Sequence, residues 1–385
     1  MRAFVFTDKA LERQAGRFVW LSINTEKREN AAVLAKYPIQ ASPTLFVLDP
    51  VAEKVVLKYV GGATVPQLQR ILDDGTRAAG KGRDGRDGRD AGKPDEWLAK
   101  ADALYSAGQN KEAAEAYRAA LKVMAKSSPS YPRAVESLLF ALSVSRQNET
   151  CAAVAREAFP HLSTSPSAAN VAGSGLDCAL ALDKSLPTKS ALVSALADDA
   201  RQVLRGPRTG LAVDDVSGLY LTVAEERDSA DDAAGRKKVL EELAAYLEAE
   251  AAKGKTPEAR AAFDAHRITA YLELGQPERG IPMLEASEKD FPDDYNPPAR
   301  LALAYRGMKK YDEALAASDR ALLRAYGPRK LVILGVRADV YEKMGNPAGA
   351  RKTREDALAW AESLPKEQVS ERQMAALKKQ LEIPR

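Results

Sequence analysis

The chain has 385 residues, of which 45% are hydrophobic and 29% charged, a composition typical of folded globular protein and a length too great for one ordinary core. Its 57 lysines and arginines nearly balance its 54 aspartates and glutamates. The resulting net charge of +3 disfavours a nucleic-acid-binding protein, which usually has a strongly basic face. No apolar run approaches the roughly 18 to 20 residues of a membrane-spanning helix, so we expect no membrane span.

Residues 1–74 are predicted to form an α/β segment. Apolar, β-branched runs alternate with helical patterns, so we expect the order helix, strand, helix, strand, strand, helix. The predicted elements cover residues 4–14, 18–24, 26–36, 44–48, 54–60 and 65–72. The strand at 18–24 is predicted from its sequence, Phe-Val-Trp-Leu-Ser-Ile-Asn, which is typical of a buried strand.

The sequence Tyr-Pro-Ile-Gln-Ala-Ser-Pro-Thr-Leu-Phe at residues 37–46, with the glycine pair at 61–62, resembles the second half of the thioredoxin family. The resemblance implies a cis peptide bond between Ser42 and Pro43, a form that costs only ~0.5–1 kcal/mol before proline. It also implies that the loop of Ser42, Pro43 and Thr44 offers backbone groups to an extended substrate peptide. The alternative is that Pro43 merely begins a strand, where its missing N–H does little harm.

The thioredoxin resemblance is incomplete, because the sequence has neither the family's first strand nor its Cys-x-x-Cys motif. In the family that strand lies between the strands predicted here at 18–24 and 44–48. Its loss would leave backbone groups unpaired, at about 1–3 kcal/mol for each buried group. Two explanations stay open: a start assigned too far downstream, or a degenerate domain that survives by docking on the rest of the chain. We therefore assign no catalytic residue.

Residues 75–94 are predicted to form a flexible linker between this segment and the rest of the chain. They contain three successive Gly-Arg-Asp units and no large apolar residue, so they have little to bury on folding. A basic arm that binds nucleic acid is the alternative. The alternation of arginine with aspartate favours the linker.

Residues 95–385 are predicted to form an all-α array of helical repeats. Residues near its start have the spacing of a tetratricopeptide unit: Trp97, Ala101, Gly108, Ala113, Tyr117 and Ala120. In such a unit Trp97 and Tyr117 are expected to fill the space between the two helices. Three units near the C-terminus each place a tyrosine four residues before a turn, at Tyr271, Tyr305 and Tyr341. The helical patterns between them are predicted to be decayed units of the same type. The resemblance implies a superhelix whose concave face binds protein or peptide partners, with a structural spacer as the alternative.

Two cysteines and two histidines are the remaining candidates for chemistry. Cys151 and Cys178 flank a predicted turn between two helices, so a disulfide is geometrically reasonable and would stabilise the fold by roughly 3 kcal/mol. It would indicate an oxidising compartment, whereas two buried, reduced cysteines are the alternative. His161 and His266 are isolated, and no pair among the four residues has metal-ligand spacing, so we expect no metal, no cofactor and no catalytic histidine.

Two functional interpretations follow from these observations. In the first, the chain is a bacterial-type thioredoxin-family protein whose complete form would be a thiol–disulfide oxidoreductase, redox-inactive as it stands, with repeats that recruit a client protein. In the second, it is a non-enzymatic tetratricopeptide scaffold that carries a degenerate thioredoxin fold. A periplasmic or secreted location follows only if the true start lies upstream and carries an export signal.

Overall fold

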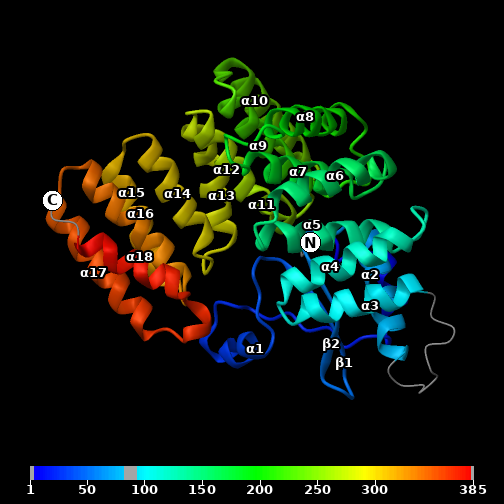
Figure 1. The fold of residues 1–385 in the computed structure, drawn as a ribbon. Helices are drawn as coiled ribbons and strands as arrows, with labels where there is room; N and C mark the ends of the chain where they lie inside the picture. Colours follow the sequence, from blue (N-terminus) through cyan, green and yellow to red (C-terminus); the bar gives the residue numbers. More distant parts are fainter. Residues whose placement is uncertain (1–3, 82–92, 383–385) are drawn as a thin grey trace. The chain divides into compact units, whose positions relative to one another are not determined.

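The computed structural model describes residues 4–81 and 93–382. The chain divides into two compact units, and each is made of two separate stretches of the sequence. The first unit combines Met1–Ala15 with Gln40–Leu240, and the second combines Gly16–Ile39 with Glu241–Arg385. Helices dominate both units (Figure 1). None of the helices in the described part of the chain is long and apolar enough to cross a membrane.

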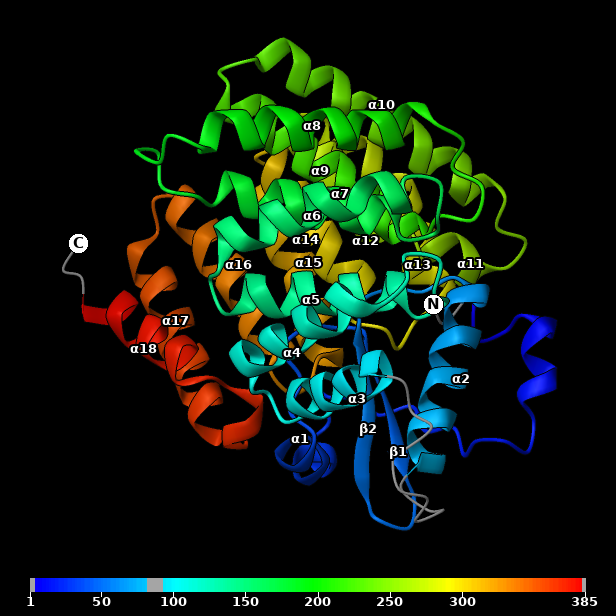
Figure 2. The same ribbon diagram turned by 45° about the vertical axis from the view of Figure 1, so that its right-hand side comes forward.

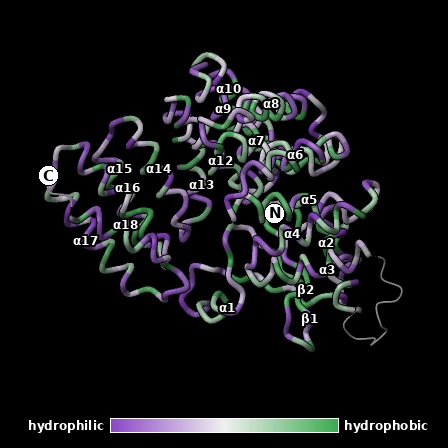
Figure 3. The backbone as a smooth tube through the Cα atoms, in the orientation of Figure 1, coloured by the Kyte–Doolittle hydropathy of each residue, from purple (hydrophilic) through white to green (hydrophobic). Residues whose placement is uncertain are grey.

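The first unit contains a β-hairpin and a helix that covers it. Strands β1 (Thr44–Asp49) and β2 (Lys54–Val60) pair antiparallel, and both are predominantly hydrophobic (Figure 3). Helix α2 (Val65–Lys81) packs on the strands. Gly75 permits this close approach, because a Cβ atom there would lie 2.8 Å from side-chain carbons of Val47.

The rest of the first unit is built from helices in succession. Their bounds are α3 (Lys93–Ser106), α4 (Asn110–Val123), α5 (Tyr131–Val144), α6 (Asn148–Leu162), α7 (Ala168–Leu180), α8 (Lys189–Arg205), α9 (Val213–Ser229) and α10 (Ala233–Ala252), the last of which continues into the second unit. Alanines and leucines recur on their buried faces, as the 3.6-residue period requires.

The second unit begins with a short segment, η2 (Arg28–Asn30) and α1 (Ala31–Lys36), and then continues in the C-terminal half of the chain. The bounds there are α11 (Pro257–Ala261), α12 (Asp264–Glu273), η3 (Pro277–Gly280), α13 (Ile281–Asp290), α14 (Asn296–Gly307), α15 (Tyr311–Arg324), α16 (Arg329–Lys343), α17 (Pro347–Ser363), η4 (Lys366–Gln368) and α18 (Glu371–Glu382). The three units expected near the C-terminus therefore exist as successive helical pairs.

Most of the repeated hairpins end their first helix in one common way. In six of them the residue that turns the chain has a positive φ, namely Gly108, Arg146, Asp231, Gly275, Lys309 and Gly345; the connection between α7 and α8 has no such residue. The N–H of the next residue then donates to a carbonyl in the last helical turn, for example from Gln276 to Tyr271, Lys310 to Tyr305 and Asn346 to Tyr341. This Schellman-type turn satisfies carbonyls that the helix end leaves open. The tyrosine spacing in the sequence therefore marks a repeated hairpin geometry.

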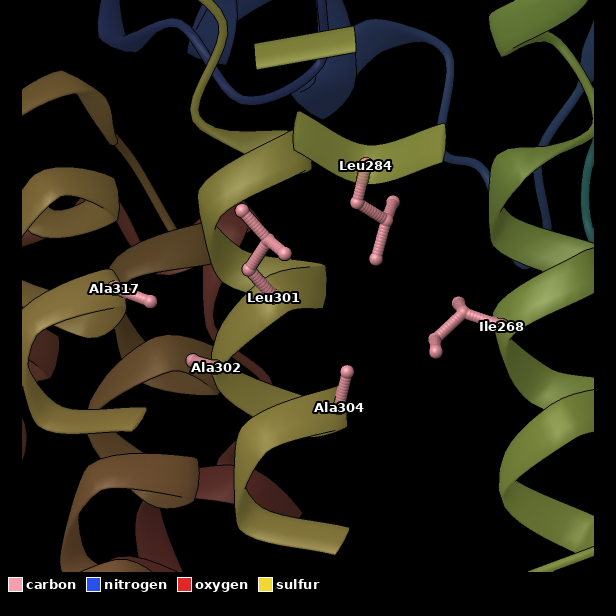
Figure 4. Packing of buried hydrophobic residues seen from close by; sticks show 6 residues of the cluster. All are labelled: Ile268, Leu284, Leu301, Ala302, Ala304 and Ala317. Carbon is pink, nitrogen blue, oxygen red and sulfur yellow. The ribbon is translucent and has the colours of Figure 1, made fainter. Parts of the chain in front are cut away.

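Small residues let the helices of the second unit approach closely. Figure 4 shows the core of this unit, in which side chains from α12, α13, α14 and α15 meet. The cluster consists of Ile268, Leu284, Leu301, Ala302, Ala304 and Ala317. Three of its members are alanines, and larger residues at these positions would force the backbones apart. The alternation of alanine with leucine and isoleucine is the packing pattern expected of the repeats.

Residues 18–24 do not form the predicted strand. The sheet of the described residues has two strands, β1 and β2, and it lacks the arrangement that the thioredoxin resemblance implies. In this segment Val19 is 89% exposed and Leu21 is 78% exposed, although their types are typical of a buried strand. The physical reason is that a strand needs a partner for its backbone groups, and no neighbouring strand pairs with this run.

Three further expectations differ from the structure. The helix predicted at 4–14 is reduced to the short η1 (Lys9–Gln14), capped by Asp8. The predicted linker at 75–94 begins inside α2 and ends inside α3, and its residues 82–92 lie outside the described part of the chain. Trp97 is an exposed residue beneath the Lys100 ammonium, and its neighbour Leu98 is the one buried in the core.

Candidate functional site

A groove of ≈ 900 Å³ lies on the surface of the first unit, between α4 and α6. Both helices pack on α5, which forms the floor (Figure 2). The groove lies where α4 and α6, which belong to consecutive helical pairs, each pack on α5. A surface depression of this size is large enough to accept part of a partner molecule.

Apolar side chains cover the floor of the groove. Leu121 and Met124 reach it from the α4 side, and Val135 and Leu138 from α5. All four are buried against the neighbouring helices, so they are held in fixed positions. On the α6 side the surface is formed by Ala153, Val154 and Ala158, among other residues. Because the four floor side chains are almost fully buried, the apolar surface open to a partner comes from Ala119, Ala153 and Val154, which lie on a base that need not rearrange.

The two walls of the groove differ in net charge. The α4 wall presents Arg118 and Lys122, one helical turn apart, together with Glu115, and the α6 wall presents Glu149 and Glu157, two turns apart. At one end Lys126 lies 3.8 Å from Glu157 and donates to the Tyr131 hydroxyl at 3.0 Å. The α4 wall therefore carries a net positive charge and the α6 wall a net negative charge.

The α6 wall is fixed from behind. Cys151 and Cys178 are joined by a disulfide that links α6 to α7, with their Cα atoms 6.0 Å apart. Gly175 on α7 lies directly against α6, where an added Cβ atom would overlap the Cβ of Ala155. Arg156 also donates to both carboxylate oxygens of Asp199 on α8, at 2.6 and 2.7 Å. These contacts hold the acidic wall in place.

The opposite wall and the floor are fixed by buried charges. Arg133 on α5 donates to Asp102 on α3 at 2.8 and 3.1 Å and to Asp74 on α2 at 2.8 Å. The Tyr117 hydroxyl on α4 donates to the same Asp102 at 2.6 Å. Burial alone would lower the pKa of Arg133, but the two carboxylates raise it above its ordinary value. Burial and the Asp102 carboxylate likewise raise the pKa of Tyr117, so its proton stays in this contact.

A second buried polar cluster lies between β2 and the repeats. The Tyr59 hydroxyl is 3.1 Å from Oε2 of Glu136 on α5 and 3.0 Å from the Gly62 carbonyl oxygen. Burial raises the pKa of Glu136 to about 7. Burial, followed by the charge of Glu136, also raises the pKa of Asp215 on α9 well above its ordinary value. This pair is the clearest perturbed acid cluster of the first unit, and sequence reasoning gave no sign of it.

The predicted site residues fall in two separate places. Ser42 and Pro43 are exposed at the start of β1, and the peptide bond between them is cis. Pro43 accepts from the Gly61 N–H at 3.0 Å, and the Thr44 hydroxyl donates to the Ala41 carbonyl at 2.6 Å. The peptide-binding role of Ser42, Pro43 and Thr44 stays a prediction. Among the described residues, no group of histidine, cysteine or acidic side chains could hold a metal ion.

The groove itself was not predicted from the sequence. Its floor residues look like ordinary core positions of helical repeats, and its wall charges look like ordinary solvated helix faces. The available signal was the sign of the charges, since Arg118 and Lys122 lie on one helix and Glu149 and Glu157 on another. That signal has meaning only once the packing of both helices on α5 is known.

The hairpin geometry defines the chain as a helical-repeat protein of tetratricopeptide-like fold. No family model and no curated protein matches the sequence. One similar solved structure is a tetratricopeptide repeat protein from Parabacteroides merdae. It is 11% identical, covers 74% of this chain and 98% of its own, and has a TM-score of 0.44.

Two further solved structures are similar over long stretches. The TPR2AB domain of yeast Sti1, in complex with pHSP90, is 16% identical and covers 75% of this chain and 98% of its own, with a TM-score of 0.28. The human IFIT1 dimer with m7Gppp-AAAA is 14% identical and covers 88% of this chain and 74% of its own, with a TM-score of 0.37. The fold assignment rests on the hairpins of the chain itself.

Proposed function

We propose that the chain is a non-enzymatic interaction scaffold that binds an amphipathic helix of a partner protein in the groove between α4 and α6. The observation that carries this proposal is the combination of an apolar floor with two walls of opposite net charge. Such a groove should bind a partner helix that has an apolar stripe, acidic residues on one flank and basic residues on the other.

A helix suits the groove better than an extended strand. The groove is bordered by side chains rather than by free backbone N–H and C=O groups, so it offers no ladder for a strand to join. Its α6 wall repeats at helical spacing, with Thr150, Val154 and Ala158 in one row and Glu149, Ala153 and Glu157 in the next. Rows of this spacing form ridges, and another helix can seat its own ridges between them.

The scaffold interpretation is favoured over the thiol–disulfide oxidoreductase. A redox-active thiolate needs exposure and a cationic environment or a helix N-terminus open to substrate. Here both cysteines are buried and joined to each other between two repeat helices. Their contacts support a role in holding α6, which forms one wall of the groove.

The test is a selection of displayed helical peptides against the full chain, followed by affinity measurement with the purified peptides. We expect selected peptides to carry the apolar stripe and the two charged flanks. Their affinity should fall at least ~10-fold for Arg118→Glu/Lys122→Glu and return when the acidic flank of the peptide is changed to lysine. The matched control is Lys100→Glu/Lys111→Glu, two exposed cations outside the groove. Equal binding to both double variants would refute the groove as the site.

A further inference from the structure

The second unit holds a short turn of its own chain in the manner of a bound peptide. Residues 24–27 form this turn, in which the Lys27 N–H donates to the Asn24 carbonyl at 3.3 Å. The Asn24 side chain closes the turn by accepting from the Glu26 N–H at 2.9 Å. These local bonds give the segment a fixed shape before any contact with the repeats is counted.

The Glu26 carboxylate is held by side chains of the C-terminal repeats. The Tyr295 hydroxyl, just before α14, donates to its Oε2 at 2.5 Å, and Arg329 at the start of α16 pairs with its Oε1. Burial and the Glu26 carboxylate both raise the pKa of Tyr295, so this phenol remains a donor. Next to it, the Asn24 amide donates to the Tyr326 hydroxyl at 2.8 Å. The site therefore recognises one carboxylate and one amide.

The backbone of the turn is recognised as well. The Gln368 amide donates to the carbonyl oxygens of Thr25 and Lys27, both at 3.1 Å. Gln368 is itself buried, at the end of η4, so this amide is held in place by its surroundings. Contacts to two alternate carbonyls read the shape of the turn and do not depend on its side chains. Any segment with the same turn could make them, and an acidic third residue would add the contacts to Tyr295 and Arg329.

The contacts between residues 24–27 and the repeat helices are partly exposed to solvent, so a partner segment could replace these residues. The Arg329 side chain is 53% exposed and that of Glu26 is 16% exposed, so water can reach the ion pair. The residues immediately before the turn, including Val19 and Leu21, are largely exposed and add little burial. An ion pair that is half-exposed on the arginine side contributes less net stability than a fully buried pair, because the guanidinium is solvated when the two charges separate.

We propose that Tyr295, Tyr326, Arg329 and Gln368 form a peptide-binding site, and that residues Asn24–Lys27 occupy it in cis. The ligand class is a turn with the pattern Asn-x-Glu, presented by another protein. Occupancy in cis makes the segment an internal competitor at an effective concentration of about millimolar, so a partner peptide binds strongly only when the segment is released. This site is independent of the groove in the first unit, and each can fail its test without the other.

The experiment measures the binding of a fluorescein-labelled peptide with the sequence of residues 20–30 to the full chain, by fluorescence anisotropy. Wild-type protein should bind it weakly, because the cis segment fills the site. The variant Asn24→Ala/Glu26→Ala should bind it at least ~10-fold more tightly. Adding Arg329→Gln/Gln368→Ala to that variant should remove the gain. Glu29→Ala, an exposed acidic residue just beyond the turn, is the matched control and should behave as wild type.

A second peptide, with alanine in place of the glutamate that corresponds to Glu26, distinguishes specific binding through the carboxylate from nonspecific binding. It should bind the released variant at least ~10-fold more weakly than the parent peptide. If the released variant has lost its helical circular dichroism, the comparison is repeated with Glu26→Gln, which keeps a side chain able to accept from Tyr295. The proposal is overturned if a folded released variant binds the parent peptide no more tightly than wild type, or if both peptides bind equally.

Discussion

The two units each hold a segment from the first part of the chain, and they hold it differently. In the first unit, Asp74 of α2 meets Arg133 of α5 at 2.8 Å, with both side chains 7% exposed. In the second unit, Glu26 meets Arg329, with a half-exposed arginine. The chemical pair is the same in both places. The burial differs. When a buried pair is broken, a charge is left without solvent or partner at a high free-energy cost, whereas an exposed charge is solvated by water.

Segments from the first part of the chain are therefore attached to the repeat helices in two physically different ways. The contact between α2 and the repeats is part of the core, since Arg133 also bonds Asp102, which bonds Tyr117 on the next helix. The turn at residues 24–27 is held by polar contacts at the surface of its unit. The first form suits a permanent structural element, and the second suits a segment that can exchange with a partner.

The largest expected effect is that of Arg133→Ala. This change leaves the Asp102 carboxylate buried without its cation and leaves Asp74 with only the more exposed Arg77, so we expect the free energy of unfolding to fall by about 3–5 kcal/mol. The measurement is urea denaturation, followed by circular dichroism. Lys111→Ala, on the exposed face of α4, is the control and should change stability by less than ~0.5 kcal/mol. A loss below ~1 kcal/mol for Arg133→Ala would show that the buried network does not anchor α2.

The next effect is that of removing the Cys151–Cys178 disulfide. The double change Cys151→Ala/Cys178→Ala opens a loop with a sequence separation of 27, for which we expect a loss of roughly 3 kcal/mol. Intact mass spectrometry under non-reducing conditions should first show that wild-type protein lacks two hydrogens. If oxidised wild type and the double variant unfold at the same urea concentration, the disulfide does not fix the α6 wall.

A pH effect should follow from Glu136. Its pKa rises from 4.5 to about 7 on folding, so the folded state binds a proton more tightly than the unfolded state does. The free energy of unfolding contributed by this group is therefore greatest below pH 4.5 and falls as the pH rises to about 7, by roughly 2–3 kcal/mol. The groups facing it are Tyr59, Ser167, Arg133 and Asp215, of which Asp215 acts with the same sign.

The test of this pH effect compares wild type with Glu136→Gln. The variant keeps a hydrogen-bonding side chain but cannot titrate, so its stability should fall less between pH 5 and pH 8. The difference between the two curves isolates Glu136 from the other carboxyl groups. Parallel curves for wild type and Glu136→Gln would contradict the assignment.

The smallest effect is expected from Arg329→Gln in the second unit. The ion pair with Glu26 is exposed on the arginine side, so we expect global stability to change by less than ~1 kcal/mol. The local change should be larger, because residues 24–30 should exchange their amide hydrogens faster. A global loss comparable to that of Arg133→Ala would remove the distinction between the two attachments.

The sequence predicted the repeats better than the segments attached to them. Repeat hairpins depend on local patterns, such as the tyrosines before the turns at Gly275 and Gly345, and these patterns were visible. The strand prediction at 18–24 was wrong because strand formation depends on a partner elsewhere in the chain. Trp97 was predicted to lie between two helices, but the buried face of α3 includes Leu98 instead. Which face of a helix is buried also depends on its packing partners.

The candidate sites were beyond sequence reasoning for a different reason. The groove depends on which faces of α4, α5 and α6 remain uncovered, and that depends on the packing of all three helices. The contact between Glu26 and Arg329 joins residues separated by 303 positions. No local pattern marks either of them as special, because an exposed glutamate or arginine on a helix is ordinary.

Hydrogen exchange measured by mass spectrometry on the full chain tests the central distinction most directly. It reports local opening segment by segment, on a common scale of free energy. We expect the amide hydrogens of α2 to exchange as slowly as those of α5. Those of residues 24–30 should exchange far faster than those of α14 and α16, and faster still when the peptide of residues 20–30 is added. Equal protection of residues 24–30 and the helices that hold them, unchanged by the peptide, would contradict this expectation.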